Sequence, residues 1–342
     1  MTEQLFPTQI YKLPTTSRRL AYSEVGDSQA PHVLLCLPGL LETRASFDPL
    51  LQSAASLQGL RVVSLDLCGR GDSDASPNDA GYCMSQYLQD TTSFIRDVLL
   101  TQGQALPRIT LLGTSMGGIL AMYLSQNPQL GIQALFLNDV GLSLHWMSIY
   151  GLYGSMKKDG RMPAPDELAQ QLHVSLGVVA AVQSPHHFDL PYKKDWKGMR
   201  FVQVLHGFTG ELRLVYGNES GVCLGAQVVE LQTHFPKARV LEVAGAKHPV
   251  PFDAATCAFL LKGLGVVTPK PQAVVKPAWE TEPAPAPLVA QAPQMLALPV
   301  KELPLEVPAV VAPPVAQVAE PISQAQTPWW RWLKQRLTPK AK

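Results

Sequence analysis

The chain has 342 residues, which favours one large domain with an added segment over two unrelated halves. Its 28 Lys and Arg residues balance 27 Asp and Glu residues, so a formal net charge of +1 provides no overall attraction to nucleic acid. No run of about 18 apolar residues could span a bilayer, and residues 1–12 lack the basic start and apolar run of a secretory signal. We therefore expect a cytoplasmic protein without nucleic-acid partners.

The cysteines and histidines show no pattern that would hold a metal ion. The cysteines are odd in number and contain no C-x-x-C pair, which also argues against a disulfide framework. They are Cys36, Cys68, Cys83, Cys223 and Cys257. The adjacent pair His186 and His187 has no third ligand at a recognisable spacing. We expect reduced thiols, no metal and no cofactor.

Short aliphatic runs alternate with longer mixed segments up to Gly265, which is typical of a mostly parallel, doubly wound α/β sheet. The expected strands are Gln9–Leu13, Arg18–Val25, His32–Leu37, Arg61–Leu67, Ile109–Gly113, Ala134–Asn138, Glu211–Tyr216 and Ala238–Val243. The first two resemble an antiparallel edge. The expected helices are Ser85–Leu100, Met116–Gln126, Ala226–Phe235 and Asp253–Leu261. In such a layout, ligands bind at the carboxyl ends of the strands.

A G-x-S-x-G sequence, Gly113-Thr114-Ser115-Met116-Gly117, follows one expected strand and begins an expected helix. Its glycines permit the tight turn that exposes a serine hydroxyl, and the helix directs its first amides toward developing negative charge. Ser115 is therefore the candidate nucleophile of this nucleophile elbow. The alternative is a chance glycine-serine turn, since the five-residue pattern alone is common.

A serine nucleophile needs a base, and His248 has the position that a base requires. It lies between the last expected strand and the last expected helix, in the sequence Gly245-Ala246-Lys247-His248-Pro249. A solvated loop histidine is the alternative interpretation.

Together with three further motifs, the elbow resembles the α/β-hydrolase superfamily over roughly Leu20 to Leu264. Leu37-Pro38-Gly39-Leu40 resembles the family's oxyanion loop, and Asp66–Asp74 resembles its D-x-x-G-x-G-x-S loop. Asn138-Asp139-Val140-Gly141 resembles the N-D-V-G of one bacterial esterase-like branch. The resemblance implies the α/β-hydrolase fold with a helical cap, and it is much less specific for substrate.

The resemblance also implies an oxyanion hole made of the backbone amides of Met116 and Leu40. The family commonly has His-Gly in this loop, whereas Pro38 precedes Gly39 here, so the hole is expected in altered form. Arg70 could organise the nearby loops, or it could be an ordinary structural arginine.

The third member of a catalytic triad departs from the family pattern. Relatives usually carry Ser-Asp after the penultimate strand, and Gly221 occupies that Asp position here. Two carboxylates could substitute: Asp139, at the end of the preceding strand, or Glu219, in the same loop. We favour Asp139, although it could have only a structural role.

The segment 142–210 is too long for a simple crossover and is rich in aromatic residues, which suits a helical cap inserted in a domain spanning residues 1–265. Its apolar side chains could line a pocket for a small hydrophobic acyl or ester substrate, or they could simply pack the cap onto the sheet.

The composition changes after Gly265, because all 25 glycines lie at or before it and 15 of the 30 prolines follow it. Residues 266–327 are expected to form a proline-rich, disordered Pro/Ala/Val linker. Residues 328–342 place three tryptophans beside Lys and Arg, as in an imperfect amphipathic helix. We expect weak peripheral attachment to a membrane or lipid-like surface, or docking to a protein partner; an unstructured end without a partner is the alternative.

These residues predict a cofactor-independent serine hydrolase that cleaves carboxylic esters through an acyl-enzyme on Ser115, with His248 as the base. A lactonase, a thioesterase or a carbon–carbon bond hydrolase would use the same arrangement. A non-catalytic or impaired binding or scaffold protein with this fold, at a membrane or lipid-like surface, is the rival hypothesis, motivated by Gly221, Pro38 and the long appended tail.

Overall fold

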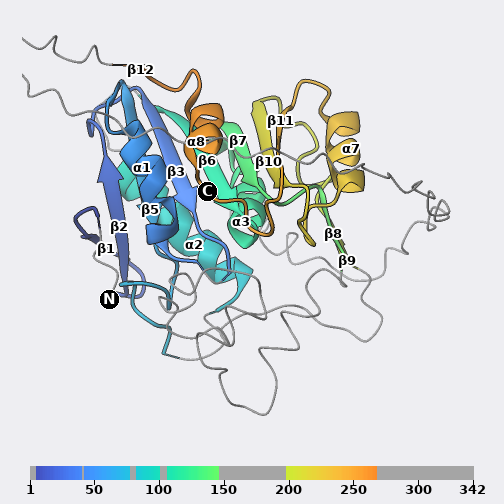
Figure 1. Ribbon diagram of the computed structural model, residues 1–342. Coiled ribbons are helices and arrows are strands. Elements are labelled where there is room, and N and C mark those ends of the chain that lie inside the picture. The colour runs from blue at the N-terminus through green and yellow to red at the C-terminus, as the bar shows by residue number, and fades with distance from the viewer. Residues whose placement is uncertain (1–4, 41, 78–81, 101–105, 146–197, 268–342) are drawn as a thin grey trace, which may run out of the picture. The chain divides into compact units, whose positions relative to one another are not determined.

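An eight-stranded sheet organises the computed structural model, which describes residues 5–40, 42–77, 82–100, 106–145 and 198–267 (Figure 1). Its strands, in spatial order, are β1 (Gln9–Lys12), β2 (Arg19–Val25), β5 (Leu60–Leu65), β3 (His32–Leu37), β6 (Arg108–Thr114), β7 (Ile132–Asn138), β10 (Glu211–Gly217) and β11 (Arg239–Val243). The β1–β2 and β2–β5 pairs are antiparallel, and the other five pairs are parallel. The expected mostly parallel sheet with an antiparallel edge is confirmed.

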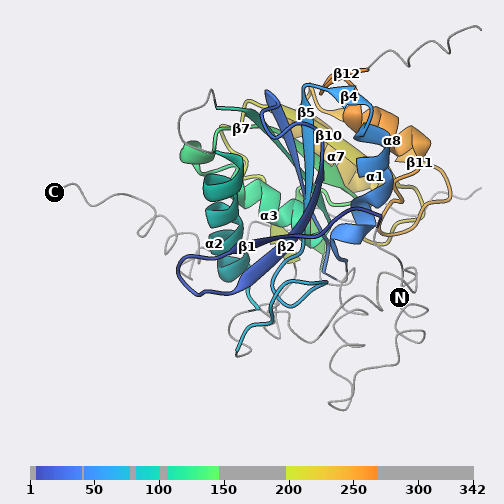
Figure 2. The same cartoon turned by 90° about the vertical axis from the view of Figure 1, so that its left-hand side faces the viewer.

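The central strands are apolar because helices cover both faces of the sheet. Figure 2 shows α1 (Asp48–Ala54) and α8 (Ala254–Leu261) on one side, and α2 (Met84–Phe94) and α3 (Met116–Leu124) on the other. The helix α7 (Gly225–His234) connects β10 to β11. One continuous core of buried side chains joins α1 and α8 to the sheet; it includes Leu34, Cys36, Phe47, Leu112, Phe136 and Leu260.

Most expected elements agree with the structure to within two residues, and the differences have local causes. The strand expected to reach Leu67 ends at Leu65, because Leu67 already accepts the backbone N–H of Arg70 in the turn that follows. The helix expected to continue regularly to Leu100 widens into a π-helical turn over Ile95–Leu99. Several short elements were not expected because they are too brief to show periodicity, among them α1, the 3-10 turns η1 (Arg44–Phe47) and η4 (Pro128–Leu130), and β4 (Leu57–Gln58).

The two ends of the expected cap insertion form a short antiparallel pair, β8 (Ser143–His145) with β9 (Gly198–Arg200). Glu230 of α7 joins these strands, since it accepts hydrogen bonds from Ser143 Oγ at 2.8 Å and from Arg200 Nη2 at 2.7 Å. The two ends of the insertion therefore lie side by side next to α7. The helices expected within it fall in residues 146–197, which lie outside the described residues.

The fold extends slightly past Gly265, where we expected the linker to begin. Val266 and Val267 form β12, which pairs antiparallel with β4. Residues 268–327 and the tail 328–342 lie outside the described part of the chain, so their disorder and surface attachment stay predictions. No helix among the described residues has the length and apolarity needed to cross a membrane.

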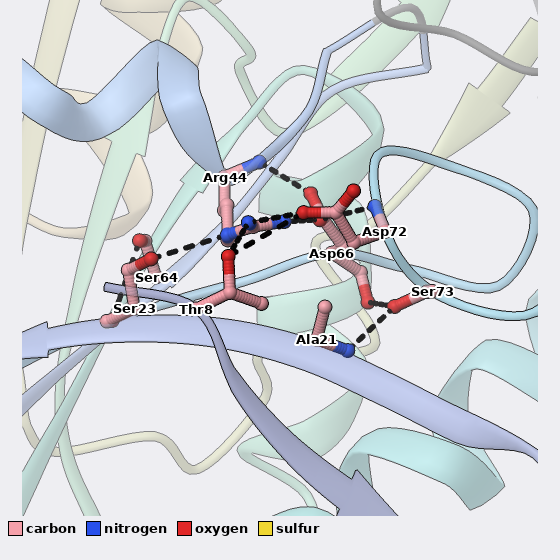
Figure 3. A network of polar contacts seen from close by, with 8 residues as sticks. All are labelled: Thr8, Ala21, Ser23, Arg44, Ser64, Asp66, Asp72 and Ser73. Atoms are coloured by element: carbon pink, nitrogen blue, oxygen red, sulfur yellow. Dashed lines mark hydrogen bonds and ion pairs between the residues drawn. The ribbon is translucent and has the colours of Figure 1, made fainter. Parts of the chain in front are cut away.

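A buried ion-pair network holds the segment after β3 against the segment after β5 (Figure 3). The Arg44 guanidinium pairs with Asp66, and its Nη2 lies 2.5 Å from Asp72 Oδ2 and 2.6 Å from Thr8 Oγ1. The backbone N–H of Arg44 also donates to Asp66 Oδ1 at 2.7 Å. Only 2% of the Arg44 side chain and none of the Asp66 side chain is exposed. Gly71 is required beside this network, because a Cβ there would lie 2.1 Å from Asp66 Oδ2.

We predict that Arg44→Gln lowers the free energy of unfolding by about 3 kcal/mol or more, because it leaves the Asp66 carboxylate buried without its counter-ion. Arg19→Gln is the matched control. Arg19 pairs with Asp74 at 2.9 Å with 60% of its side chain exposed, so solvent screens the pair and its loss should destabilise the fold much less. Urea unfolding of both variants measures the difference; equal losses would contradict a special role for the buried pair.

Candidate active site

Ser115 lies on a strained turn between β6 and α3. Its backbone has φ 50° and ψ −114°, a conformation that non-glycine residues seldom adopt. The glycines around it allow close packing: a Cβ on Gly117 would lie 2.1 Å from the Leu37 carbonyl oxygen, and one on Gly113 would lie 2.3 Å from Gly117. The N–H of Ser115 donates to the Asn138 carbonyl at 3.0 Å. The turn therefore presents the serine hydroxyl at the carboxyl end of the sheet.

His248 lies in the loop between β11 and α8, with its Nε2 3.0 Å from Ser115 Oγ. Neighbouring strands hold the loop in place. Asn138 Nδ2 donates to the Val250 carbonyl at 2.9 Å, and the N–H of Glu219 donates to the Ala246 carbonyl at 3.1 Å. A quarter of the His248 side chain is exposed, so part of the imidazole stays accessible while its Nε2 faces the serine.

Asp139 is fully buried directly after β7, with its Oδ2 2.7 Å from His248 Nδ1. Its backbone has a positive φ of 57°, and its N–H donates to the Val215 carbonyl of β10 at 2.8 Å. The carboxylate also accepts the N–H of Gly217 at 3.2 Å and the hydroxyl of Ser220 at 2.7 Å. Because a carboxylate accepts from Nδ1–H, the lone pair of Nε2 is left to face Ser115.

The structure brings Ser115, His248 and Asp139 together, and it does not bring the alternative acid, Glu219, to the imidazole. The Glu219 side chain is exposed, and Nδ1 of His248 is bonded to Asp139. A Cβ on Gly221 would meet nothing within 4 Å, so the position at which relatives carry Asp is sterically open.

The loop expected to supply an oxyanion amide lies against the first turn of α3. A Cβ on Gly117 would lie 2.7 Å from the Pro38 carbonyl oxygen as well as close to Leu37, so the two segments are nearly in contact. Met116 is the first residue of α3, and amides in a first helical turn have no partner within the helix. The N–H of Gly39 donates to Glu42 Oε2 at 2.7 Å, which leaves the amide of Leu40 as the candidate in this loop.

Sequence reasoning missed Glu42 and left the role of Arg70 open. Glu42 is 5% exposed, and burial raises the pKa of its carboxyl group although the Gly39 N–H acts in the opposite direction. Arg70 is 1% exposed and donates through Nε to the Leu40 carbonyl at 2.8 Å. Its Nη1 binds the Cys68 carbonyl and the Tyr87 hydroxyl. Arg70 thus organises this loop, as one of the two sequence interpretations stated, whereas no motif identifies a single glutamate in a loop.

The described residues contain no group of three His, Cys, Asp or Glu side chains that could hold a metal ion. The chemistry that this arrangement can perform is that of an activated serine beside backbone amides.

Comparisons with known proteins identify the fold. Residues 32–152 match the family model described as the alpha/beta hydrolase fold. A segment of 132 residues is 37% identical to a 3-hydroxybutyrate-oligomer hydrolase from Cupriavidus necator and covers 38% of this chain and 42% of that protein. A segment of 116 residues is 34% identical to an sn-1-specific diacylglycerol lipase from Mus musculus, covering 34% of each. The matched segments thus span less than half the length of these relatives.

The fold is shared with solved structures over a larger part of the chain. An α/β hydrolase from Novosphingobium aromaticivorans superposes with a TM-score of 0.55 and 20% identity, covering 77% of this chain and 99% of that one. At this identity the likeness concerns the fold. Together with the family model matched over residues 32–152 and the sheet topology described above, it shows that this chain has the α/β-hydrolase fold.

Proposed function

We propose that the protein is a serine hydrolase that cleaves carboxylic esters through a covalent acyl-enzyme. The observation that carries the proposal is the continuous hydrogen-bond chain from Ser115 through His248 to the buried Asp139. A weakly nucleophilic hydroxyl, a base within reach of its proton and a carboxylate that orients the base are the three parts that nucleophilic acyl transfer requires.

In the proposed reaction, Ser115 Oγ attacks the ester carbonyl while Nε2 of His248 takes the hydroxyl proton. Asp139 stabilises the imidazolium that forms. His248 then gives the proton to the leaving alcohol as the carbon–oxygen bond breaks, which leaves an ester on Ser115. A water molecule repeats the same steps, with His248 again as the base, and releases the acid and the free serine.

The backbone amides of Met116 and Leu40 are the proposed donors to the oxyanion of each tetrahedral intermediate. Their geometry depends on the loop between β3 and η1. Glu42 holds this loop at the Gly39 N–H and Arg70 holds it at the Leu40 carbonyl. These two buried side chains offer the support that the family's usual histidine, replaced here by Pro38, does not provide.

The substrate class is proposed from the relatives and the site together. The two curated relatives are named for hydrolysis of 3-hydroxybutyrate oligomers and of diacylglycerol, both of which are esters. We therefore propose a small hydrophobic acyl ester as the substrate. Lactones and thioesters undergo the same acyl transfer and belong in the first substrate screen.

The rival function is a non-catalytic binding or scaffold protein. One reason to consider it is Gly221, which stands at the family's usual acid position. The contact of 2.7 Å between Asp139 and His248 argues against this reason, because another carboxylate is in a position to orient the imidazole. Covalent labelling separates the two functions.

We predict that a fluorophosphonate probe adds one equivalent to the wild-type protein and none to Ser115→Ala, because only an activated serine reacts at an appreciable rate. Intact-mass analysis measures the adduct, and peptide mapping locates it. An unlabelled wild type, or a Ser115→Ala variant labelled to the same extent, would exclude the serine hydrolase.

The choice of acid generates a second prediction. Asp139→Asn should lower kcat about 100-fold or more, since an amide both loses the charge and favours the wrong imidazole tautomer. Glu219→Gln is the matched control and should stay within about threefold of wild type, because its side chain is exposed. Hydrolysis of p-nitrophenyl butyrate measures both. If neither variant loses more than about tenfold, or if Glu219→Gln loses more, the assignment of Asp139 is wrong.

The loop support generates a third prediction. Glu42→Leu removes the acceptor of the Gly39 N–H and should lower kcat about tenfold or more through displacement of the Leu40 amide. Glu42→Gln keeps an oxygen acceptor of the same length and should lose less. Equal activity of Glu42→Leu and wild type, with both folded by circular dichroism, would rule out this role for Glu42.

A further inference from the structure

The loop between β10 and α7 contains a buried serine that neither the motifs nor the proposed mechanism uses. Ser220 is 7% exposed and follows β10 by three residues. Its N–H donates to the Gly217 carbonyl at 3.0 Å, which closes a tight turn and directs the side chain inward. Its Oγ lies 2.7 Å from Asp139 Oδ2, the same oxygen that accepts from His248 Nδ1.

The hydroxyl of Ser220 has three partners and can donate its hydrogen to only one of them. A serine Oγ has one hydrogen and two lone pairs. The backbone N–H groups of Val222 and Cys223 both donate to Ser220 Oγ, at 3.0 and 3.2 Å, and they occupy the lone pairs. The single hydrogen is left for the Asp139 carboxylate, which can only accept while it is ionised.

We infer that Ser220 is a positioning residue that orients the Asp139 carboxylate beneath His248. The inference rests on the proposed serine hydrolase and adds the means by which an acid placed after β7 is held in a working geometry. The loop after β10, in which relatives carry the acid itself, thus contributes a hydroxyl donor here.

The contacts of Asp139 show why one more donor matters. The carboxylate is fully buried, and its donors are the Gly217 N–H, Ser220 and His248. A hydrogen bond to a charged group contributes more than one between neutral groups, so loss of the Ser220 hydroxyl removes one of the strong hydrogen bonds that hold the carboxylate. Oδ2 would then be held by the imidazole alone, and the carboxylate would be free to rotate away from it.

The test compares Ser220→Ala, Ser220→Thr and a neighbouring control, Gly221→Ala, whose new Cβ would meet nothing within 4 Å. With p-nitrophenyl butyrate, Ser220→Ala should lose about tenfold in kcat while KM changes less than about twofold, because the hydroxyl contacts the carboxylate and not the substrate. Ser220→Thr, which keeps the hydroxyl, should recover most of the lost kcat. Gly221→Ala should match wild type. Rates are normalised to folded protein by circular dichroism.

A double-mutant cycle separates action through Asp139 from a general effect on the loop. In the Asp139→Asn background, Ser220→Ala should change kcat less than about twofold, because the group on which it acts is already gone. If Ser220→Ala alone does not fold, Ser220→Cys, whose thiol is a weaker donor, must show a loss of kcat in the same direction at smaller amplitude.

A wild-type kcat in Ser220→Ala, or the same tenfold loss in both backgrounds, would overturn the inference while the serine hydrolase stands. A wild-type protein that fluorophosphonate does not label would instead overturn the proposed function, and the role of Ser220 with it.

Discussion

The Asp139 carboxylate, fully buried at the end of β7, is the constraint on which the rest of the site depends. A charge in such a place is stable only when donors surround it, and its donors come from three separate chain segments. The end of β10 supplies Gly217, the following loop supplies Ser220, and the loop after β11 supplies His248. The hydrogen bonds to this one carboxylate therefore hold the ends of three neighbouring strands together. The same contacts place Nε2 of the imidazole beside Ser115.

The nucleophile depends on close packing of main-chain segments. The turn at Ser115 exists because Gly113 and Gly117 let β6, α3 and the loop after β3 approach to distances that a Cβ would prevent. That loop is held in turn by buried ionisable side chains. Glu42 binds the Gly39 amide, Arg70 binds the Leu40 carbonyl, and Arg44 pairs with Asp66 a few residues further on. In the proposed mechanism these groups touch no substrate; they restrict where the oxyanion amides can lie, which is the basis of electrostatic preorganisation.

The acid and its support illustrate how one chemical task can be divided between two strand ends. The loop after β10 has a sterically open glycine at position 221 and a buried hydroxyl at position 220, while the charge lies after β7. The N–H of Asp139 bonds to Val215 of β10, so the two strand ends are already in register before their side chains interact. A carboxylate on either strand would lie at the same edge of the sheet, because parallel strands end together there.

The sequence by itself determined the elements and the residues whose signals are local. Aliphatic runs predicted every strand of the main sheet, since burial on both faces leaves a continuous apolar pattern, and glycine spacing predicted the turn at Ser115. His248 could be selected from its place between the last strand and the last helix. Only the tertiary structure decided which carboxylate meets the imidazole, because Asp139 and Glu219 differ in burial and in the direction of their loops rather than in any local pattern. The same holds for Glu42, Arg70 and Ser220, whose roles consist of contacts between segments that pack together only when the sheet forms.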